Sequence, residues 1–182
     1  MVYMNIHPFF VHFPIALLVA YSVIEISGSV WPASRRVAWV SPVKTFLLFA
    51  GVLAALGALA TGGIAEELVE GVNARAYILE MHSPFAAVTT LLYIILAASY
   101  TIRIFDAKGW SNRIVGSNSF LIGILNLKRR LANIILDTWA LPVLTLIALI
   151  GMVITGALGA AVVYSPDIDP IVSFVYHLFW VQ

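Results

Sequence analysis

The chain contains no cysteine, and this absence excludes several kinds of site. It rules out a disulfide framework, an iron–sulfur cluster held by thiolates, a covalently attached c-type haem and a thiol nucleophile. Charge is also scarce, because 10% of the 182 residues are charged, whereas ordinary globular chains carry about 25%. Phosphate-binding loops, HExxH zinc motifs and serine nucleophile elbows are missing as well. The sequence therefore favours an electron carrier or a subunit over a stand-alone enzyme.

What the chain does contain is apolar residues, which make up 62% of it and give a mean hydropathy of +0.99. A helix needs about 20 mostly apolar residues to cross about 30 Å of hydrocarbon. Pro84 is expected to open the third such segment, and Gly62-Gly63 to end the second. The pattern predicts an all-α integral membrane bundle, a single domain over residues 1–182, with an uncleaved first span. The four spans are residues 8–26, 43–64, 84–104 and 139–163.

The basic residues indicate how the spans are oriented. Nine of the ten lysines and arginines fall in or beside the connections between spans one and two and between spans three and four. The opposite side carries Arg75 against acidic residues that include Glu66, Glu67, Glu70 and Glu80. We therefore predict a multi-pass protein of the cytoplasmic (inner) membrane with both termini on the extracytoplasmic side.

Two further segments are too polar or too short to span. Residues 116–136 have apolar side chains at helical spacing and basic residues elsewhere on the wheel, which predicts an amphipathic helix on the inner membrane surface. Residues 170–181 are rich in aromatic residues and follow Asp169, a typical N-cap. We expect this tail to form a short helix along the outer interface.

All four histidines of the chain are expected near the outer leaflet. His12 and His82 lie on spans that enter from the same side, so they are predicted to face one another, with His12 buried more deeply than His7. Two imidazoles from facing helices are the usual ligands of b-type haem in a membrane bundle. One alternative is a copper, zinc or iron site built from several imidazoles. Another is a structural hydrogen bond from His12 to a neighbouring carbonyl.

The remaining site residues support this hypothesis. His7 and His177 are candidates for a second site or for contacts around the first, with a lipid headgroup contact as the alternative. Gly62, Gly156 and Gly159 are predicted to make room for a flat macrocycle, and tight helix packing is the other interpretation.

One carboxylate lies inside a predicted span. Glu25, near the inner end of span one, is expected to extend toward Arg35 or Arg36 at the membrane surface, with a proton relay as the alternative.

The opening of the first span also carries a family resemblance. Residues 7–14, HPFFVHFP, resemble the His-Pro-x-x-Val-His-Phe-Pro opening of the small membrane proteins grouped as domain of unknown function 2231. The likeness continues through Thr61-Gly62, His82 and the Gly156-x-x-Gly159 segment. The chain departs from the family pattern after Tyr164. The family pattern continues with a glycine-rich stretch that contains a histidine, whereas this chain has Ser165-Pro166-Asp167. The resemblance implies a four-helix membrane domain often associated with cytochromes or respiratory functions.

These observations lead to one hypothesis and two rivals. The hypothesis is a membrane b-type haem protein that carries electrons at the outer leaflet, within the lipid bilayer and in contact with other membrane subunits. Its acidic outer face is expected to suit a basic soluble cytochrome, and we expect no nucleic-acid partner. The rivals are a non-catalytic accessory subunit that packs through its glycine faces, and a non-haem metal site.

Overall fold

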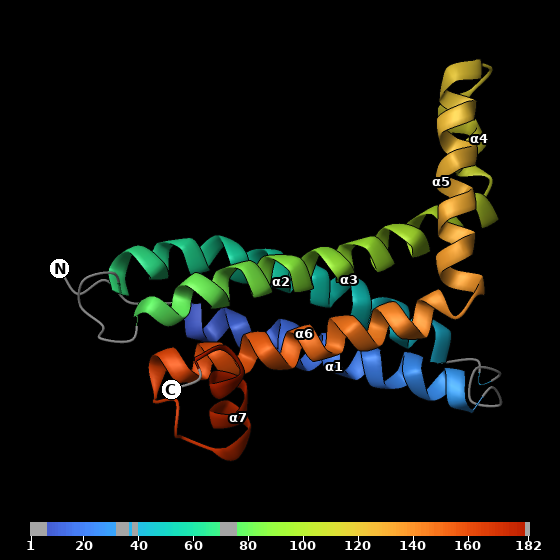
Figure 1. Cartoon of the computed structure of the whole chain (residues 1–182). Helices are drawn as coiled ribbons and strands as arrows, with labels where there is room; N and C mark the ends of the chain where they lie inside the picture. The colour runs from blue at the N-terminus through green and yellow to red at the C-terminus, as the bar shows by residue number, and fades with distance from the viewer. Residues whose placement is uncertain (1–6, 32–36, 38–39, 70–75, 181–182) are drawn as a thin grey trace.

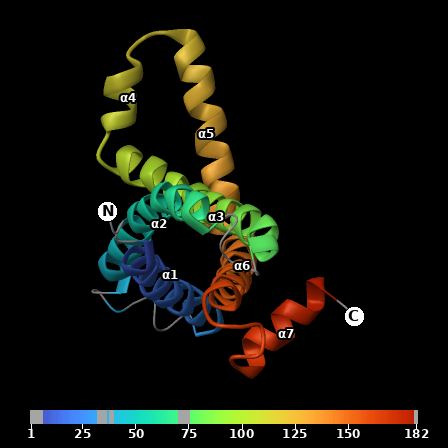
Figure 2. The ribbon, with the colours of Figure 1, turned by 90° about the vertical axis from the view of Figure 1, so that its left-hand side faces the viewer.

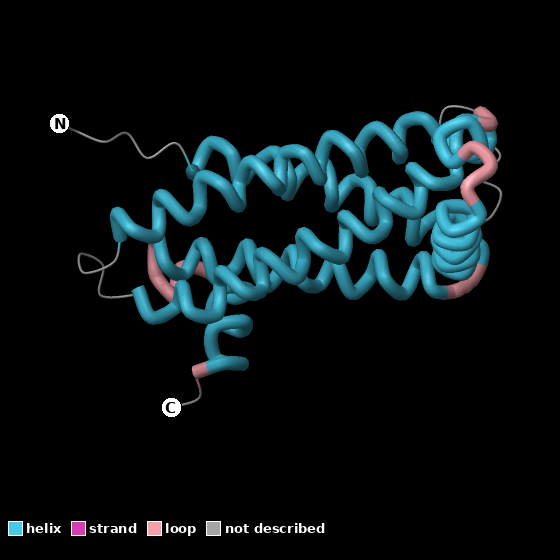
Figure 3. Tube along the Cα trace, turned by 90° about the horizontal axis from the view of Figure 1, so that it is seen from above, coloured by secondary structure: helices cyan, strands magenta, loops and turns pink. Residues whose placement is uncertain are grey.

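A computed structural model describes residues 7–31, 37, 40–69 and 76–180 of the chain. These residues form helices and the turns between them, with no strand among them (Figure 3). The order is α1 (His7–Val30), α2 (Val40–Val69), a 3₁₀ turn (Ala76–Ile78), α3 (Leu79–Ala107), α4 (Trp110–Val115), α5 (Ser119–Asp137), α6 (Ala140–Val163) and α7 (Pro170–Phe179). The predicted all-α class is confirmed.

Four of these helices, α1, α2, α3 and α6, are long and apolar enough to cross a membrane. They form a bundle in the cyclic order α1–α2–α3–α6, so that α1 and α3 lie on opposite corners (Figure 2). Apolar side chains on the outside of the bundle are exposed, among them Phe46 at 67% and Leu53 at 71%. Exposed apolar residues of this size on spanning helices are expected to contact lipid tails.

The spanning helices α1, α2 and α3 extend beyond the predicted limits at both ends, whereas α6 ends at the predicted residue and starts one residue later. Gly62-Gly63 do not end α2, which continues to Val69, and Pro84 lies inside α3 and not at its start. A glycine costs a helix about 1 kcal/mol. A backbone group left unpaired in hydrocarbon costs more, which favours an uninterrupted helix. The predictions for these two ends were therefore wrong.

The bundle has two ends that differ in what they carry (Figure 1). One end, called here the terminal end, holds the start of α1 and all of α7. The other, called the α5 end, carries α4 and α5, and α5 stands across the bundle axis (Figure 1). Both described chain ends thus lie at the same end, as an even number of spans requires. Which side of the membrane each end faces stays a prediction.

Helix α5 has the expected amphipathic character. The side chain of Asn118 accepts hydrogen bonds from the backbone N–H groups of Phe120 and Leu121, which fixes its start. This start lies three residues after the predicted one, because Gly116 adopts a φ of 59° and ends α4. The apolar residues Phe120 and Leu127 are 74% and 58% exposed, so the protein leaves the apolar face of α5 uncovered.

Helix α7 begins as predicted, with Asp169 as its N-cap. The Asp169 carboxylate accepts from the backbone N–H groups of Ile171 and Val172 at 2.8 and 2.9 Å. Val172 and Val175 are buried in a cluster with residues of α6. The tail therefore packs on the terminal end of the bundle.

Candidate functional site

A cavity of about 500 Å³ lies between the four spanning helices and reaches the terminal end. Its volume falls within the usual range for ligand sites, about 300–1,000 Å³. Its described walls are apolar apart from imidazoles and hydroxyls, and no lysine, arginine, aspartate or glutamate is among them. The polar residues that line it are His7, His12, His82, Ser83, Thr89, Thr90, Thr155 and Tyr164.

His82 is held in one orientation by α6. Its Nδ1 lies 3.1 Å from the carbonyl oxygen of Thr155. A carbonyl oxygen can only accept, so Nδ1 carries the proton and Nε2 carries the lone pair. The ring packs against Gly159, where an added Cβ would stand 3.1 Å from its Cε1 atom. Glycine at this position leaves the Thr155 carbonyl accessible to the imidazole.

His7 is held in a similar way by α2. Its Nδ1 lies 3.1 Å from the Thr61 hydroxyl, which itself donates to the carbonyl of Gly57 at 3.0 Å. The single proton of that hydroxyl is thereby used, so Thr61 accepts from the Nδ1–H group of His7. The ring rests against Gly62, where a Cβ would stand 3.3 Å from Cε1.

These two arrangements share a sequence pattern that the reasoning from sequence missed. Residues 57–62 of α2 and 151–156 of α6 both read Gly-x-x-x-Thr-Gly. In each, the threonine hydroxyl donates to the carbonyl of the first glycine, at 3.0 Å in α2 and 2.8 Å in α6. The pattern could have been found by comparing the second and fourth spans. The α1–α2 and α3–α6 pairs of helices therefore each hold one imidazole, His7 or His82, at the same cavity.

The other predicted site residues are placed less centrally. His12 lines the cavity, but its side chain is exposed, whereas that of His7 is half-buried, the reverse of the expected order. His177 lies on α7, and its Nδ1 donates to the Ser173 carbonyl at 2.8 Å. His177 is not among the described residues that line the cavity. Gly156 faces open space, with no atom within 4 Å of where its Cβ would lie.

The sequence comparisons agree with this architecture. The family model of predicted membrane proteins with domain of unknown function 2231 (DUF2231) matches residues 3–169. The chain belongs to the DUF2231 family. Neither a curated protein nor a solved structure matches it.

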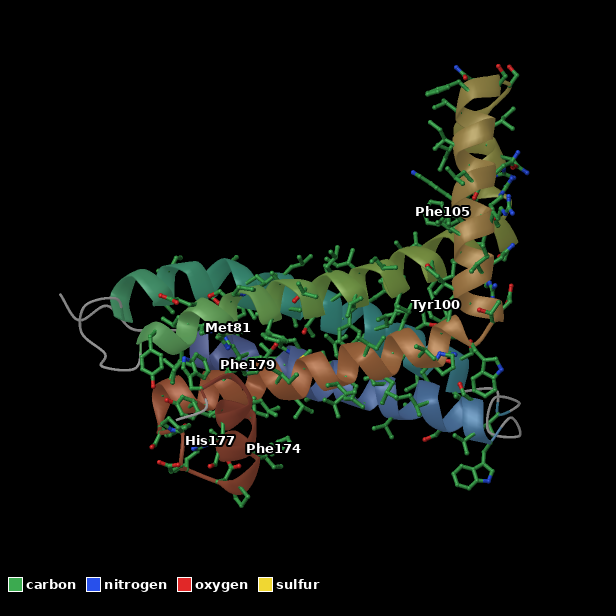
Figure 4. All side chains as sticks on the ribbon, in the orientation of Figure 1. Met81, Tyr100, Phe105, Phe174, His177 and Phe179 are labelled. Carbon is green, nitrogen blue, oxygen red and sulfur yellow. The ribbon has the colours of Figure 1, made fainter. Side chains whose placement is uncertain are left out.

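In this DUF2231 protein, aromatic side chains of α7 pack beside the cavity at the terminal end. Phe179 meets Phe85 of α3 edge to face, with ring centroids 5.3 Å apart. Phe179 and Met81 both lie toward the bundle (Figure 4). The hydroxyls of Tyr77 and Tyr176 are 2.6 Å apart. His177 and Phe174 lie on the exposed part of α7 (Figure 4). The helix thus covers part of the terminal end.

A second polar group lies at the α5 end and was assigned incorrectly from the sequence. Glu25 is 1% exposed and does not extend to the membrane surface. Its Oε2 atom is 2.7 Å from Nζ of Lys44, and it accepts from the Tyr100 hydroxyl at 2.8 Å. The predicted partners Arg35 and Arg36 lie outside the described residues. Lys44 was missed because the sequence placed it in the connection before the second helix.

Proposed function

We propose that this DUF2231 protein binds haem b in the central cavity and carries electrons at the outer leaflet. The observation that carries the proposal is the pair of half-buried imidazoles, His7 and His82, which line one cavity from opposite corners of the bundle. Neighbouring helices pack about 8–10 Å apart, so diagonal helices are about 11–14 Å apart. Both imidazoles line the cavity, and an iron held by imidazoles from two diagonal helices would suit such a separation.

The residues present fit a haem in three respects. Apart from imidazoles and hydroxyls the cavity walls are apolar, a lining that would suit a macrocycle, and Gly156 leaves space beside them. The Nδ1–H group of each histidine is engaged by a neighbouring helix, as is typical of metal-ligating imidazoles. His7 and His82 would hold the iron through Nε2. When bound, the haem would supply one-electron chemistry, and the protein would set its orientation and its surroundings.

The geometry favours His7 over His12 as the partner of His82. His7 is half-buried and oriented by Thr61, whereas His12 is exposed at the cavity wall. The non-haem alternative has less support, because the described residues contain no group of three or more His, Cys, Asp or Glu side chains able to hold a metal ion. The accessory-subunit alternative has the glycine faces pack against a larger complex. Instead, Gly51, Gly57, Gly62, Gly151 and Gly159 all lie against side chains within the bundle.

The test is an absorption spectrum of the detergent-purified protein, oxidised and dithionite-reduced, with a pyridine haemochrome assay. We expect a b-type spectrum in wild type and in the control His177→Ala, whose side chain lies outside the cavity wall. His82→Ala and His7→Ala should lose it. If His12→Ala lost the b-type spectrum and His7→Ala kept it, the ligands would be His12 and His82, the pair expected from the sequence. A colourless wild type made under haem-sufficient conditions would refute electron transfer through haem.

A further inference from the structure

Buried polar side chains in the described residues follow one line through the bundle. Seven serine, threonine and glutamate side chains are buried, and five of them make up a series that starts at Glu25 and ends at the floor of the cavity. Tyr21 and Tyr93, both 0% exposed, lie between these five. The five are Ser22, Glu25, Thr89, Thr90 and Thr145. A bundle that needed only to pack would fill these positions with apolar residues, because buried polar groups are costly in hydrocarbon.

The line begins with an ion pair near the α5 end. Glu25 lies five residues before the last residue of α1, which places it about 7.5 Å inside the end of the helix. The side chain of Lys44 is 15% exposed, so its ammonium connects the buried carboxylate with the bundle surface. Tyr100 donates to the same carboxylate oxygen and lies toward the α5 end (Figure 4). Buried ion pairs contribute little net stability, so stability alone does not explain this one.

Tyrosine hydroxyls continue the line toward the middle of the membrane. The Tyr21 hydroxyl lies near those of Tyr100 and Thr145, although it forms no hydrogen bond of good geometry with any described residue. Such a buried hydroxyl is a usual place for an internal water. The ring of Tyr21 meets that of Tyr93 edge to face, with centroids 6.3 Å apart.

The line ends at the cavity. Ser22 donates to the Leu18 carbonyl at 2.8 Å, so it accepts from the Tyr93 hydroxyl, also at 2.8 Å. Thr89 and Thr90 lie one turn before Tyr93 on α3 and line the cavity floor. Thr90 and Tyr100 are ten residues apart, which corresponds to about 15 Å along the helix. The hydroxyls and the carboxylate therefore cover the part of the bundle that the cavity does not reach.

We propose that this line conducts protons between the α5 end and the central cavity. Glu25 takes up a proton at Lys44 and exchanges it with the Tyr100 hydroxyl. An internal water at the Tyr21 hydroxyl would carry the proton on to Tyr93 and Ser22, and water in the cavity would take it up beside Thr89 and Thr90, one turn from Tyr93. Each hydroxyl accepts one proton and releases its own, so the net result is the movement of a proton with no oxidation or reduction. Ionisable residues inside spans commonly serve such relays. The proposal does not depend on haem binding.

The test is proton entry into liposomes that contain the full chain and an internal pH-sensitive dye, driven by a potassium diffusion potential with valinomycin. Wild type should acidify the interior faster than protein-free liposomes. Glu25→Gln and Tyr93→Phe should each lower the protein-dependent rate by about tenfold or more, because each removes a proton-transferring group. Ser99→Ala is the matched control, since Ser99 is buried on α3 but donates only to its own helix, at Ile95.

A second variant separates proton transfer from folding. Glu25→Asp keeps an ionisable carboxylate, so we expect it to retain conduction that Glu25→Gln loses. Equal losses in both variants would point to packing and overturn the proposal. Wild-type rates no faster than those of protein-free liposomes would also overturn it, as would an unchanged rate in Tyr93→Phe. The assay uses no haem signal, so its outcome is independent of the absorption spectrum.

Discussion

One methyl group added to α6 tests whether His82 is seated as the structure describes. At Gly159, an added Cβ would lie 3.1 Å from Cε1 and 3.6 Å from Nδ1 of His82. The first distance is too short for an ordinary van der Waals contact, so the ring must move by a few tenths of an ångström. Gly156 lies three residues earlier on the same helix, and a Cβ there would meet no atom within 4 Å. The two positions thus differ in whether an added methyl group would meet the His82 ring.

Two opposing effects set the change in the free energy of unfolding in these two variants. Alanine is favoured over glycine inside a helix by about 1 kcal/mol, and this gain applies at both positions. Overpacking costs about 1–3 kcal/mol, and this cost applies only at Gly159. We therefore expect Gly156→Ala to raise the free energy of unfolding by up to about 1 kcal/mol. Gly159→Ala should be less stable than Gly156→Ala by about 1–3 kcal/mol.

The measurement is thermal unfolding of both variants in the same detergent, in protein from which haem has been omitted, so that packing is read without ligand. A second measurement is nuclear magnetic resonance of the His82 ring, because its displacement should weaken the hydrogen bond to the Thr155 carbonyl. Identical unfolding curves for the two variants would refute the reasoning, because His82 would then not rest on Gly159.

Three further predictions concern α7 and the orientation of the chain. Asp169→Ala removes an N-cap and should destabilise α7 by about 1 kcal/mol, seen as faster proteolysis of the tail; unchanged proteolysis would contradict the cap. The Tyr77 hydrogen bond raises the pKa of Tyr176. The stability that this hydrogen bond gives to the folded protein should therefore be fully present below the ordinary tyrosine pKa, about 10. It should be lost as the pH rises through the higher pKa that Tyr176 has in the folded protein. Tryptophan fluorescence should show this transition in wild type but not in Tyr176→Phe, and a transition in both would exclude the pair. Because the chain lacks cysteine, Ser117→Cys should react with an impermeant maleimide only after permeabilisation and Asp167→Cys in intact cells; the opposite result would invert the topology.

The sequence predicted the features that depend on local composition. Spans are long apolar runs, so their number and approximate positions follow from hydropathy. The cap at Asp169 depends on backbone groups two and three residues away and was likewise predictable. Helix ends were less predictable, because the cost of breaking a helix in lipid outweighs the weak helix preference of Gly62-Gly63.

The site was predicted less well because side-chain direction depends on how helices rotate against one another. The sequence placed His7, His12 and His82 at the same end, and all three line one cavity. The sequence could not show how far each histidine is exposed, since His7 is half-buried through contact with Gly62 of another helix. The partner of Glu25 was missed for the same reason, because Lys44 approaches it only after α1 and α2 pack together.

The bundle divides its chemistry between diagonal pairs of helices. The imidazoles His7 and His82, the carboxylate of Glu25 and the hydroxyl of Tyr93 all belong to α1 and α3. Helices α2 and α6 supply mainly glycines and threonine backbone or hydroxyl groups that receive those side chains, as Gly159 receives His82. Because large polar side chains on one diagonal need small residues on the other, a polar line can run along the axis without separating the helices. The same division explains why the glycines of α2 and α6 lie mostly inside the bundle, and it makes them part of the site.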